Sequence, residues 1–296
     1  MTIGILLCGG FPAALEAKFG SYSSMVRELL GSRSAAVFDV RERQLPGSIS
    51  ACEAYVITGS SAGVYDDLPW IKDLMAFLRK ARGGSKLIGI CFGHQAMAQA
   101  FGGSVIKSPK GWGIGLHRYE LSARPHWMDA AAAVAAPASH QDQVVALPSD
   151  AQVIASSAFT PYAGLDYGDA ISFQFHPEFS RAFAAALIEA KRERYPDLVA
   201  SAVQSHLQPD DCARVGRWIG RFLDTGDAAP RPALIGEDLS EPASRVGFTL
   251  GERDRTLREL VRVACGAPAP NPGRNDDVES VFVLRRRCRR PQTSGE

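Results

Sequence analysis

The sequence has no long apolar run. Nowhere in its 296 residues is there a stretch near the roughly 18 apolar residues that a membrane-spanning helix requires. It also has almost no excess of charge, because 33 Lys and Arg residues stand against 32 Asp and Glu residues, for a formal net charge of +1. Such a balance gives no general attraction to nucleic acid or to an anionic membrane. We therefore expect neither kind of partner.

Cysteine is scarce as well. The six cysteines lie far apart and include no Cys-x-x-Cys pair, so we expect neither a disulfide framework nor a zinc ribbon. The start of the chain, residues 1–10, lacks the basic segment of a secretory signal peptide and instead has the pattern of a first buried strand. These features predict a cytoplasmic protein.

Apolar runs alternate with amphipathic stretches through the first two thirds of the chain. Apolar residues at helical spacing predict helices at 21–30, at 69–82 and after Cys91. The alternation predicts an α/β protein with a mostly parallel open sheet and helices on both faces. Ligands of such sheets bind at the carboxyl ends of the strands. The expected strands are 3–8, 35–40, 54–58, 87–90 and 170–175.

The pattern becomes less regular between residues 103 and 167, where short apolar runs predict a smaller antiparallel or mixed region packed on the main sheet. The Ala-rich stretch 129–138 contains Pro137, and we expect a surface helix or loop there. Further helices are expected at 181–191 and 212–223. The residues after 226 are rich in Pro, Arg and Gly. We therefore divide the chain into a domain over 1–225 and a poorly ordered tail over 226–296.

Cys91 stands between Gly89 and Gly93, at the end of an expected strand and directly before an expected helix. A thiol at such a turn is exposed at the sheet edge, near the positive end of the helix, which stabilises a thiolate. The glycines let the backbone bend sharply and leave room for a substrate. Cys91 is therefore a candidate nucleophile. The alternative is a buried structural cysteine.

A thiol nucleophile needs a base, and His176 is the best placed of the six histidines because it follows a strand end directly. Pro177 stiffens the turn that follows. Glu178 would lie on the same side of an extended segment as His176 and could orient its imidazole. Cys91, His176 and Glu178 could thus supply nucleophile, base and carboxylate. Taken alone, a His-Pro-Glu sequence is more often an ordinary loop, and it becomes a strong candidate only together with the cysteine turn.

The segment Gly89-Ile-Cys-Phe-Gly-His-Gln95, the distant His176-Pro-Glu178 and the turn at Gly59 resemble the motifs of class I glutamine amidotransferases, in that family's order. The resemblance covers roughly residues 1–190 and implies the flavodoxin-like glutaminase fold of the family. The segments 110–115 and 139–144 are most similar to free-standing amidotransferase-like proteins, among them the γ-glutamyl peptidases of plants. The glutaminase domain of GMP synthase is similar too.

This resemblance implies that Cys91, His176 and Glu178 form a catalytic triad that cleaves a γ-glutamyl amide through a thioester. The backbone N–H groups of Ser60 and Phe92 would stabilise the oxyanion of that reaction. Many relatives have glycine where this chain has Ser60, which puts the preorganisation of the oxyanion hole in question. No metal and no cofactor are expected.

The resemblance also implies substrate-binding residues. Gln95 matches the position whose side chain contacts substrate, although it could instead make a local bond at the start of its helix. His140 and Asp142 could line the γ-glutamyl pocket or have only a structural role in their loop, and Trp112 could either wall the pocket or simply pack. The implied substrate-binding residues are Gly59, Gln95, His140 and Asp142.

The chain has neither a Gly-x-x-x-x-Gly-Lys-Ser/Thr phosphate loop nor a Ser-Gly-Gly-x-Asp-Ser pyrophosphatase loop. We therefore expect no ammonia-consuming synthetase domain in it. Three functions for a small-molecule substrate stay open. The first is a glutaminase-type hydrolase that releases ammonia, with a separate ammonia-accepting synthetase subunit as a possible partner. The others are a stand-alone γ-glutamyl peptidase and a non-catalytic subunit that binds a γ-glutamyl ligand.

Overall fold

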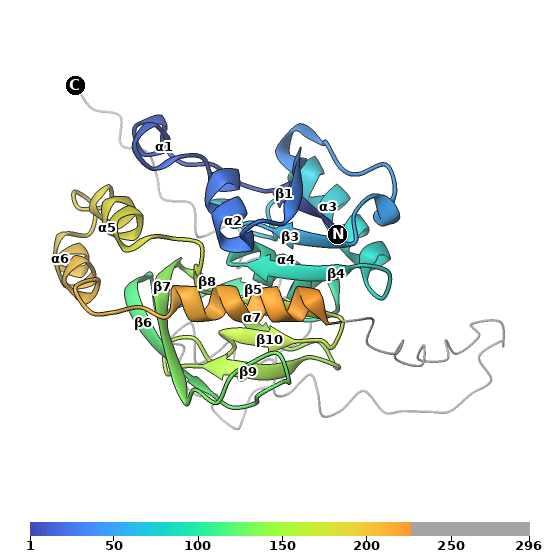
Figure 1. The fold of residues 1–296 in the computed structure, drawn as a ribbon. Coiled ribbons are helices and arrows are strands. Elements are labelled where there is room, and N and C mark those ends of the chain that lie inside the picture. Colours follow the sequence, from blue (N-terminus) through green and yellow to red (C-terminus); the bar gives the residue numbers. More distant parts are fainter. Residues whose placement is uncertain (226–296) are drawn as a thin grey trace, which may run out of the picture. The chain divides into compact units, whose positions relative to one another are not determined.

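The computed structural model describes residues 1–225, in which nine strands form one sheet and two more form a separate pair (Figure 1). The order in the sheet is β2-β1-β3-β4-β11-β10-β9-β6-β7, and β5 pairs with β8. The strands are β1 Thr2–Leu7, β2 Ser34–Asp39, β3 Ala54–Ile57, β4 Lys86–Ile90, β5 Ser104–Lys107, β6 Gly113–Leu121, β7 Ala133–His140, β8 Asp142–Ala146, β9 Gln152–Ser156, β10 Gly164–Asp166 and β11 Ala170–Phe173.

The first five strands in that order, from β2 to β11, run parallel, and the remaining four pair antiparallel. Strands β3 and β11 are buried along their whole length, as expected for parallel strands covered on both faces. Their register aligns Ile57 with Gly89 and Phe173 with Ile90. The carboxyl ends of β3, β4 and β11 therefore meet at one edge of the sheet.

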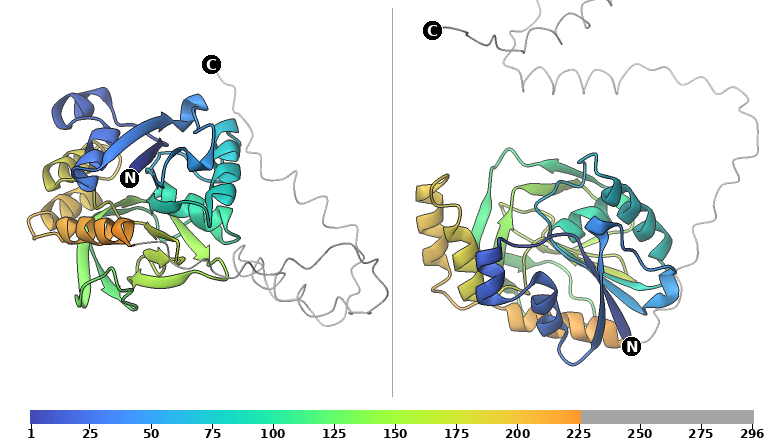
Figure 2. Two further views of the ribbon diagram at one scale, coloured as in Figure 1. Left: turned by 45° about the vertical axis from the view of Figure 1, so that its right-hand side comes forward. Right: turned by 90° about the horizontal axis from the view of Figure 1, so that it is seen from above.

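Helices cover both faces of this sheet, which confirms the predicted fold class. One apolar core lies under α2 and α7 and another under α3 and α4, on opposite faces of the strands (Figure 2). The helices are α1 Ala13–Phe19, α2 Tyr22–Leu30, α3 Pro69–Ala81, α4 Phe92–Ala100, α5 Arg181–Glu189, α6 Pro196–Ser205 and α7 Cys212–Asp224.

Local sequence explains where these helices begin. The Ser21 side chain accepts a hydrogen bond from the N–H of Ser24 and so caps α2, and Ser180 caps α5 through the N–H of Phe183. Helix α3 starts with Pro69, whose fixed φ suits the first helical turn.

Two predictions for the middle of the chain are wrong, one of them only in part. Residues 133–140 form strand β7, where we expected a surface helix or loop. The Ala residues of β7 pair along most of β6, and Pro137 lies opposite Leu116 in this ladder at the edge of the sheet, where proline is tolerated. The prediction for the region 103–167 is wrong only in part: its strands do pair antiparallel, but β10, β9, β6 and β7 continue the main sheet and are not packed on it.

Within residues 1–225, no helix is both long enough and apolar enough to cross a lipid bilayer. The longest helices there, α3 and α7, have 13 residues each. The tail over 226–296, for which we predicted poor order, lies outside the described residues.

Candidate functional site

Cys91 lies in a sharp turn between β4 and α4. Its φ is 52° and its ψ is −102°, a region that residues other than glycine rarely adopt. The N–H of Cys91 donates to the carbonyl of Phe173 at 2.8 Å, and its own carbonyl accepts from the N–H of Gln95 at 3.1 Å. The turn is thus held by the neighbouring strand on one side and by the first turn of the helix on the other. Such over-determined strain is typical of functional sites.

The two glycines of this turn allow backbones to come close together. A Cβ on Gly93 would lie 2.2 Å from the carbonyl oxygen of Ile57, and a Cβ on Gly89 would lie 2.7 Å from the carbonyl of Gly93. Helix α4 can therefore pack directly on β3 and β4 only if both positions lack a side chain.

His176 and Glu178 lie just after β11, at the same edge of the sheet. Nδ1 of His176 donates to Oε1 of Glu178 at 2.7 Å, and both side chains are buried. The ring of Phe179 stacks on the imidazole with centroids 4.0 Å apart and planes inclined by 6°. Burial by itself would lower the pKa of His176, but the charges of Glu178 and Cys91 outweigh it and raise the pKa to about 10.

Tyr22, at the start of α2, is a site residue that sequence reasoning missed. Its hydroxyl donates to Oε1 of Glu178 at 2.9 Å and accepts from the N–H of Gly59 at 2.9 Å. Burial, and then the charges of Glu178 and Cys91, raise the pKa of Tyr22 well above its usual value, so the hydroxyl keeps its proton. In the sequence Tyr22 has the pattern of a core residue of an amphipathic helix, and nothing there reveals its hydroxyl partners.

Gln174 is a second residue that we missed. Its Nε2 lies 3.7 Å from Sγ of Cys91, within contact of the thiol, and its Oε1 accepts from Nε2 of Gln95 at 3.1 Å. A signal for it existed in the sequence, because Gln174 interrupts an otherwise apolar run at the end of a buried strand. A fully buried polar side chain in such a run needs a hydrogen-bond partner.

The Gly59 turn packs against both His176 and Cys91. A Cβ on Gly59 would lie 3.2 Å from Cε1 of His176 and 3.5 Å from Cβ of Cys91. Within residues 1–225, neither the N–H of Ser60 nor that of Phe92 donates a hydrogen bond. Within these residues both N–H groups are thus without a hydrogen-bond partner, and Ser60 lines the cavity that contains Cys91.

The structure places Gln95 of α4, His140 and Asp142 together, with Gln95 and His140 buried and Asp142 half-buried. Nε2 of Gln95 donates to the carbonyl of Asp142 at 2.9 Å, and Nδ1 of His140 lies 3.2 Å from that same oxygen. The Asp142 carboxylate accepts from the hydroxyl of Tyr65 at 2.8 Å. Burial, and then the charges of His117 and His176, lower the pKa of His140 to about 3, so its ring is neutral at physiological pH.

A cavity of about 450 Å³, which we call the Cys91 cavity, opens over the thiol. Its lining includes His176, the Gly59 turn, Trp112 and Lys191. Trp112 thus walls this cavity, whereas the cluster of Gln95, His140 and Asp142 does not line it.

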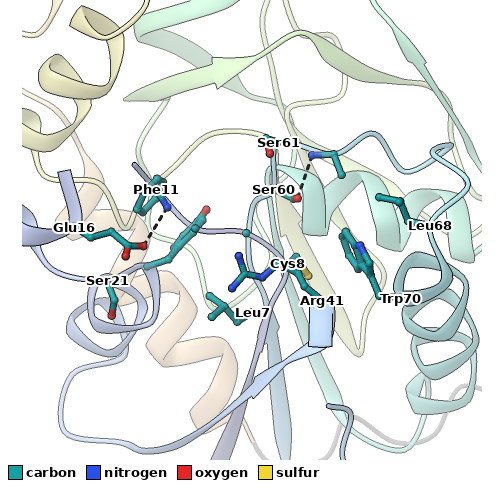
Figure 3. A pocket seen from close by; sticks show the side chains of 14 residues that line it. Leu7, Cys8, Phe11, Glu16, Ser21, Arg41, Ser60, Ser61, Leu68 and Trp70 are labelled. Atoms are coloured by element: carbon teal, nitrogen blue, oxygen red, sulfur yellow. Dashed lines mark hydrogen bonds between the residues drawn. The ribbon is translucent and has the colours of Figure 1, made fainter. Parts of the chain in front are cut away.

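A second cavity of about 630 Å³, which we call the Arg41 cavity, is shown in Figure 3. The two cavities have residues 9–11, Tyr22 and residues 60–61 of their linings in common. Arg41 and Glu16 both line this cavity, with Glu16 at the left and Arg41 near the centre of Figure 3. Within residues 1–225, no three His, Cys, Asp or Glu side chains are grouped so that they could hold a metal ion.

Comparison with known proteins gives a consistent result. The family model "Glutamine amidotransferase class-I" matches residues 19–190. A glutamine amidotransferase-like protein of Schizosaccharomyces pombe is 28% identical over 199 residues, which cover 60% of this chain and 79% of that protein. Gamma-glutamyl peptidase 4 of Arabidopsis thaliana is 29% identical over 183 residues, which cover 58% of this chain and 73% of the peptidase.

Two further matches differ from these, one in covering only part of the relative and the other in its low sequence identity. The glutamine-hydrolyzing GMP synthase of Mycobacterium bovis is 33% identical over 157 residues, 49% of this chain but only 26% of the synthase. The crystal structure of a glutamine amidotransferase from Thermotoga maritima has a TM-score of 0.62 at 18% identity and covers 76% of this chain and 98% of its own. At that identity the likeness supports the fold.

Proposed function

Because the chain belongs to the class I glutamine amidotransferase family, whose enzymes are of the glutaminase type, we propose that it hydrolyses a γ-glutamyl amide with Cys91 as nucleophile. The observation that carries the proposal is that His176, which is hydrogen-bonded to Glu178, lines the same cavity as the strained Cys91 turn. Neither feature alone would be sufficient, but together they supply nucleophile, base and orienting carboxylate.

In the proposed reaction the thiol proton of Cys91 passes to His176, the sulfur attacks the γ-carbonyl carbon, and the N–H groups of Ser60 and Phe92 bind the oxyanion. As the C–N bond breaks, the imidazolium of His176 gives its proton to the leaving amine, and a thioester remains on Cys91. A water molecule, deprotonated by His176, then hydrolyses the thioester to glutamate and restores the thiol. Glu178 holds the imidazole ring throughout.

The serine at position 60 bears on how well this oxyanion hole is formed. Ser60 has no positive φ, so it adopts an ordinary backbone conformation, and its Oγ accepts from the N–H of Ala62 at 3.1 Å. Its own N–H stays unbonded. A serine can therefore serve as the backbone donor here.

A stand-alone γ-glutamyl peptidase is the second candidate function. It is favoured by the Arabidopsis relatives, of which this chain covers 73% and 84% of the length in two cases. Three further points stay predictions. They are the delivery of ammonia to a separate synthetase subunit, a cytoplasmic location, and the binding of substrate by Gly59, Gln95, His140 and Asp142. The third possibility, a non-catalytic subunit that binds a γ-glutamyl ligand, would be indicated if the following experiment found no turnover.

The test is release of glutamate from glutamine and from a γ-glutamyl dipeptide by the purified chain. We expect turnover of at least one substrate, and a fall of about 10³-fold or more when Cys91→Ala removes the nucleophile. Cys52→Ala, at a buried free thiol outside both cavities, is the matched control and should keep its activity. Equal rates for Cys91→Ala and wild type would overturn the proposal.

A further inference from the structure

Lys191 brings a cation into the same cavity as the proposed nucleophile. It lies two residues beyond the end of α5, and its Nζ stands 4.3 Å from the centre of the Trp112 ring. Both side chains line the Cys91 cavity, and both are half-buried. The face of an aromatic ring attracts and positions an ammonium group, so Trp112 holds the lysine at this place.

No acidic side chain neutralises this cation. None of the ion pairs within residues 1–225 includes Lys191, and the adjacent Glu189 pairs with Arg192 instead. The effects on Lys191 are burial first and then the positive charge of Arg194, and both lower its pKa. A half-buried ammonium without a carboxylate partner, in a cavity that contains a nucleophile, suits an anionic part of a ligand.

The position of His176 indicates which part of the substrate would reach Lys191. His176 must protonate the leaving amine, so the leaving group has to lie on its side of the scissile bond. His176 lines the Cys91 cavity together with Lys191, and it does not line the Arg41 cavity. If the substrate were glutamine, the leaving group would be ammonia, which needs neither additional space nor a cation in the Cys91 cavity. An amino acid as leaving group would fill that space and carries a carboxylate.

The glutamyl part of the substrate has a carboxylate of its own. Three residues predicted to bind that part, Gln95, His140 and Asp142, form a cluster that does not line the Cys91 cavity. Lys191 does line this cavity, together with His176, the proposed proton donor to the leaving amine. This placement favours the leaving group, and not the glutamyl carboxylate, as the partner of Lys191.

We propose that Lys191, held by Trp112, forms a leaving-group subsite that binds the carboxylate of an amino acid or dipeptide amine. The preferred substrates are then γ-glutamyl peptides, and glutamine is a poorer substrate. This inference rests on the proposed hydrolysis of γ-glutamyl amides. It adds a specificity-determining residue that contacts the leaving group. The acyl-enzyme formed on Cys91 is the same for every γ-glutamyl substrate, so Lys191 would affect only the step in which that acyl-enzyme forms.

The experiment compares γ-glutamylglycine, whose leaving amine has a carboxylate, with γ-glutamylethylamide, whose leaving amine has none. For the full chain we expect kcat/KM to favour γ-glutamylglycine by about tenfold to a hundredfold, the size of one charge-assisted hydrogen bond. Lys191→Met keeps the apolar stem against Trp112 but removes the charge, and should bring this ratio to about one. Lys191→Arg should restore most of the preference. Lys80→Met, at an exposed lysine on α3, is the matched control and should keep the wild-type ratio.

The outcomes separate the two proposals. Turnover of both substrates with a ratio near one in the wild type would overturn the subsite and leave the hydrolase proposal intact. An equal loss toward both substrates in Lys191→Met would assign the lysine to the glutamyl carboxylate or to folding, and would also overturn the subsite. If the wild type cleaved neither compound nor glutamine, the proposed hydrolysis would fail, and the subsite with it.

Discussion

At the scale of single residues, the hydroxyl of Tyr22 connects two parts of the candidate site. The hydroxyl donates a hydrogen bond to Oε1 of Glu178 and accepts one from the N–H of Gly59. One phenol therefore fixes the carboxylate that orients His176 and also the turn that precedes Ser60. A single atom thus couples the position of the proposed base to that of a proposed oxyanion donor.

We expect Tyr22→Phe to lower kcat about tenfold and to lower the free energy of unfolding by about 1–3 kcal/mol, because it leaves the buried N–H of Gly59 unpaired. The measurements are steady-state kinetics and urea denaturation. Tyr119→Phe is the control, since the Tyr119 hydroxyl is buried without a hydrogen-bond partner in the described residues. Similar losses in both variants would show that Tyr22 acts through packing alone.

The pKa of His176 leads to a prediction about pH. The imidazolium must donate its proton to the leaving amine, so kcat/KM should fall at high pH with a midpoint near the His176 pKa of about 10. Glu178→Gln removes a negative charge that favours the imidazolium, and the pKa must then decrease. We expect the alkaline midpoint to move down by at least about one unit.

The control for this pH profile is Glu189→Gln, which changes an exposed carboxylate paired with Arg192. Its alkaline midpoint should stay at the wild-type value. An unchanged midpoint in Glu178→Gln would mean that another group, and not His176, controls the alkaline fall.

At the scale of elements, the contact between α4 and β3 depends on the absence of a side chain at position 93. A Cβ there would be 2.2 Å from the carbonyl oxygen of Ile57, and because that oxygen belongs to the backbone of a central strand it cannot move aside easily. The Cys91 turn therefore requires glycine at 93 for packing as well as for access to the thiol.

We expect Gly93→Ala to lower the free energy of unfolding by about 1–3 kcal/mol or more, as overpacking in a core does, and to displace the Cys91 turn. Thermal unfolding and reaction of Cys91 with a thiol reagent measure the two effects. Gly47→Ala is the control, because a Cβ at Gly47 would meet no atom within 4 Å. Equal melting temperatures for Gly93→Ala and wild type would contradict the close contact.

Strand β7 shows the limit of pattern reasoning for elements. Its sequence, Ala133–His140, is rich in Ala and contains Pro137, and both residue types are depleted in strands. Pairing along the length of β6 nevertheless makes it a strand. The long parallel strands were predicted well, because their apolar runs carry their own signal of burial on both faces.

At the scale of the whole molecule, α7 completes the domain at the end of the described residues. Trp218 and Phe222 on its inner face are buried against the core that includes Met25 of α2. At the end of the helix, Nζ of Lys86 donates to the carbonyls of Phe222 and Leu223 at 2.8 and 3.1 Å. A cation at this position also interacts favourably with the negative end of the helix dipole.

We therefore expect a chain that ends after residue 225 to keep the melting temperature and the kcat/KM of the full chain, as the predicted domain boundary requires. Ending the chain after residue 211 instead removes α7 and exposes its partner surface. Each large apolar side chain lost from a core costs about 1.5–3 kcal/mol, so the sum approaches the whole stability of a domain. A folded, active 1–211 chain would contradict this role of α7.

By itself, the sequence determined the α/β fold, the Cys91 turn and the positions of His176 and Glu178 at strand ends, because these features are carried by short local patterns. Only the tertiary structure decided which distant side chains meet. Tyr22 and Glu178 are 156 positions apart, and no local pattern connects them. The same holds for Lys191 and Trp112, which line the cavity that contains the thiol and are 79 positions apart in the sequence. The proposed chemistry is thus local in the sequence, whereas the proposed choice of substrate depends on packing.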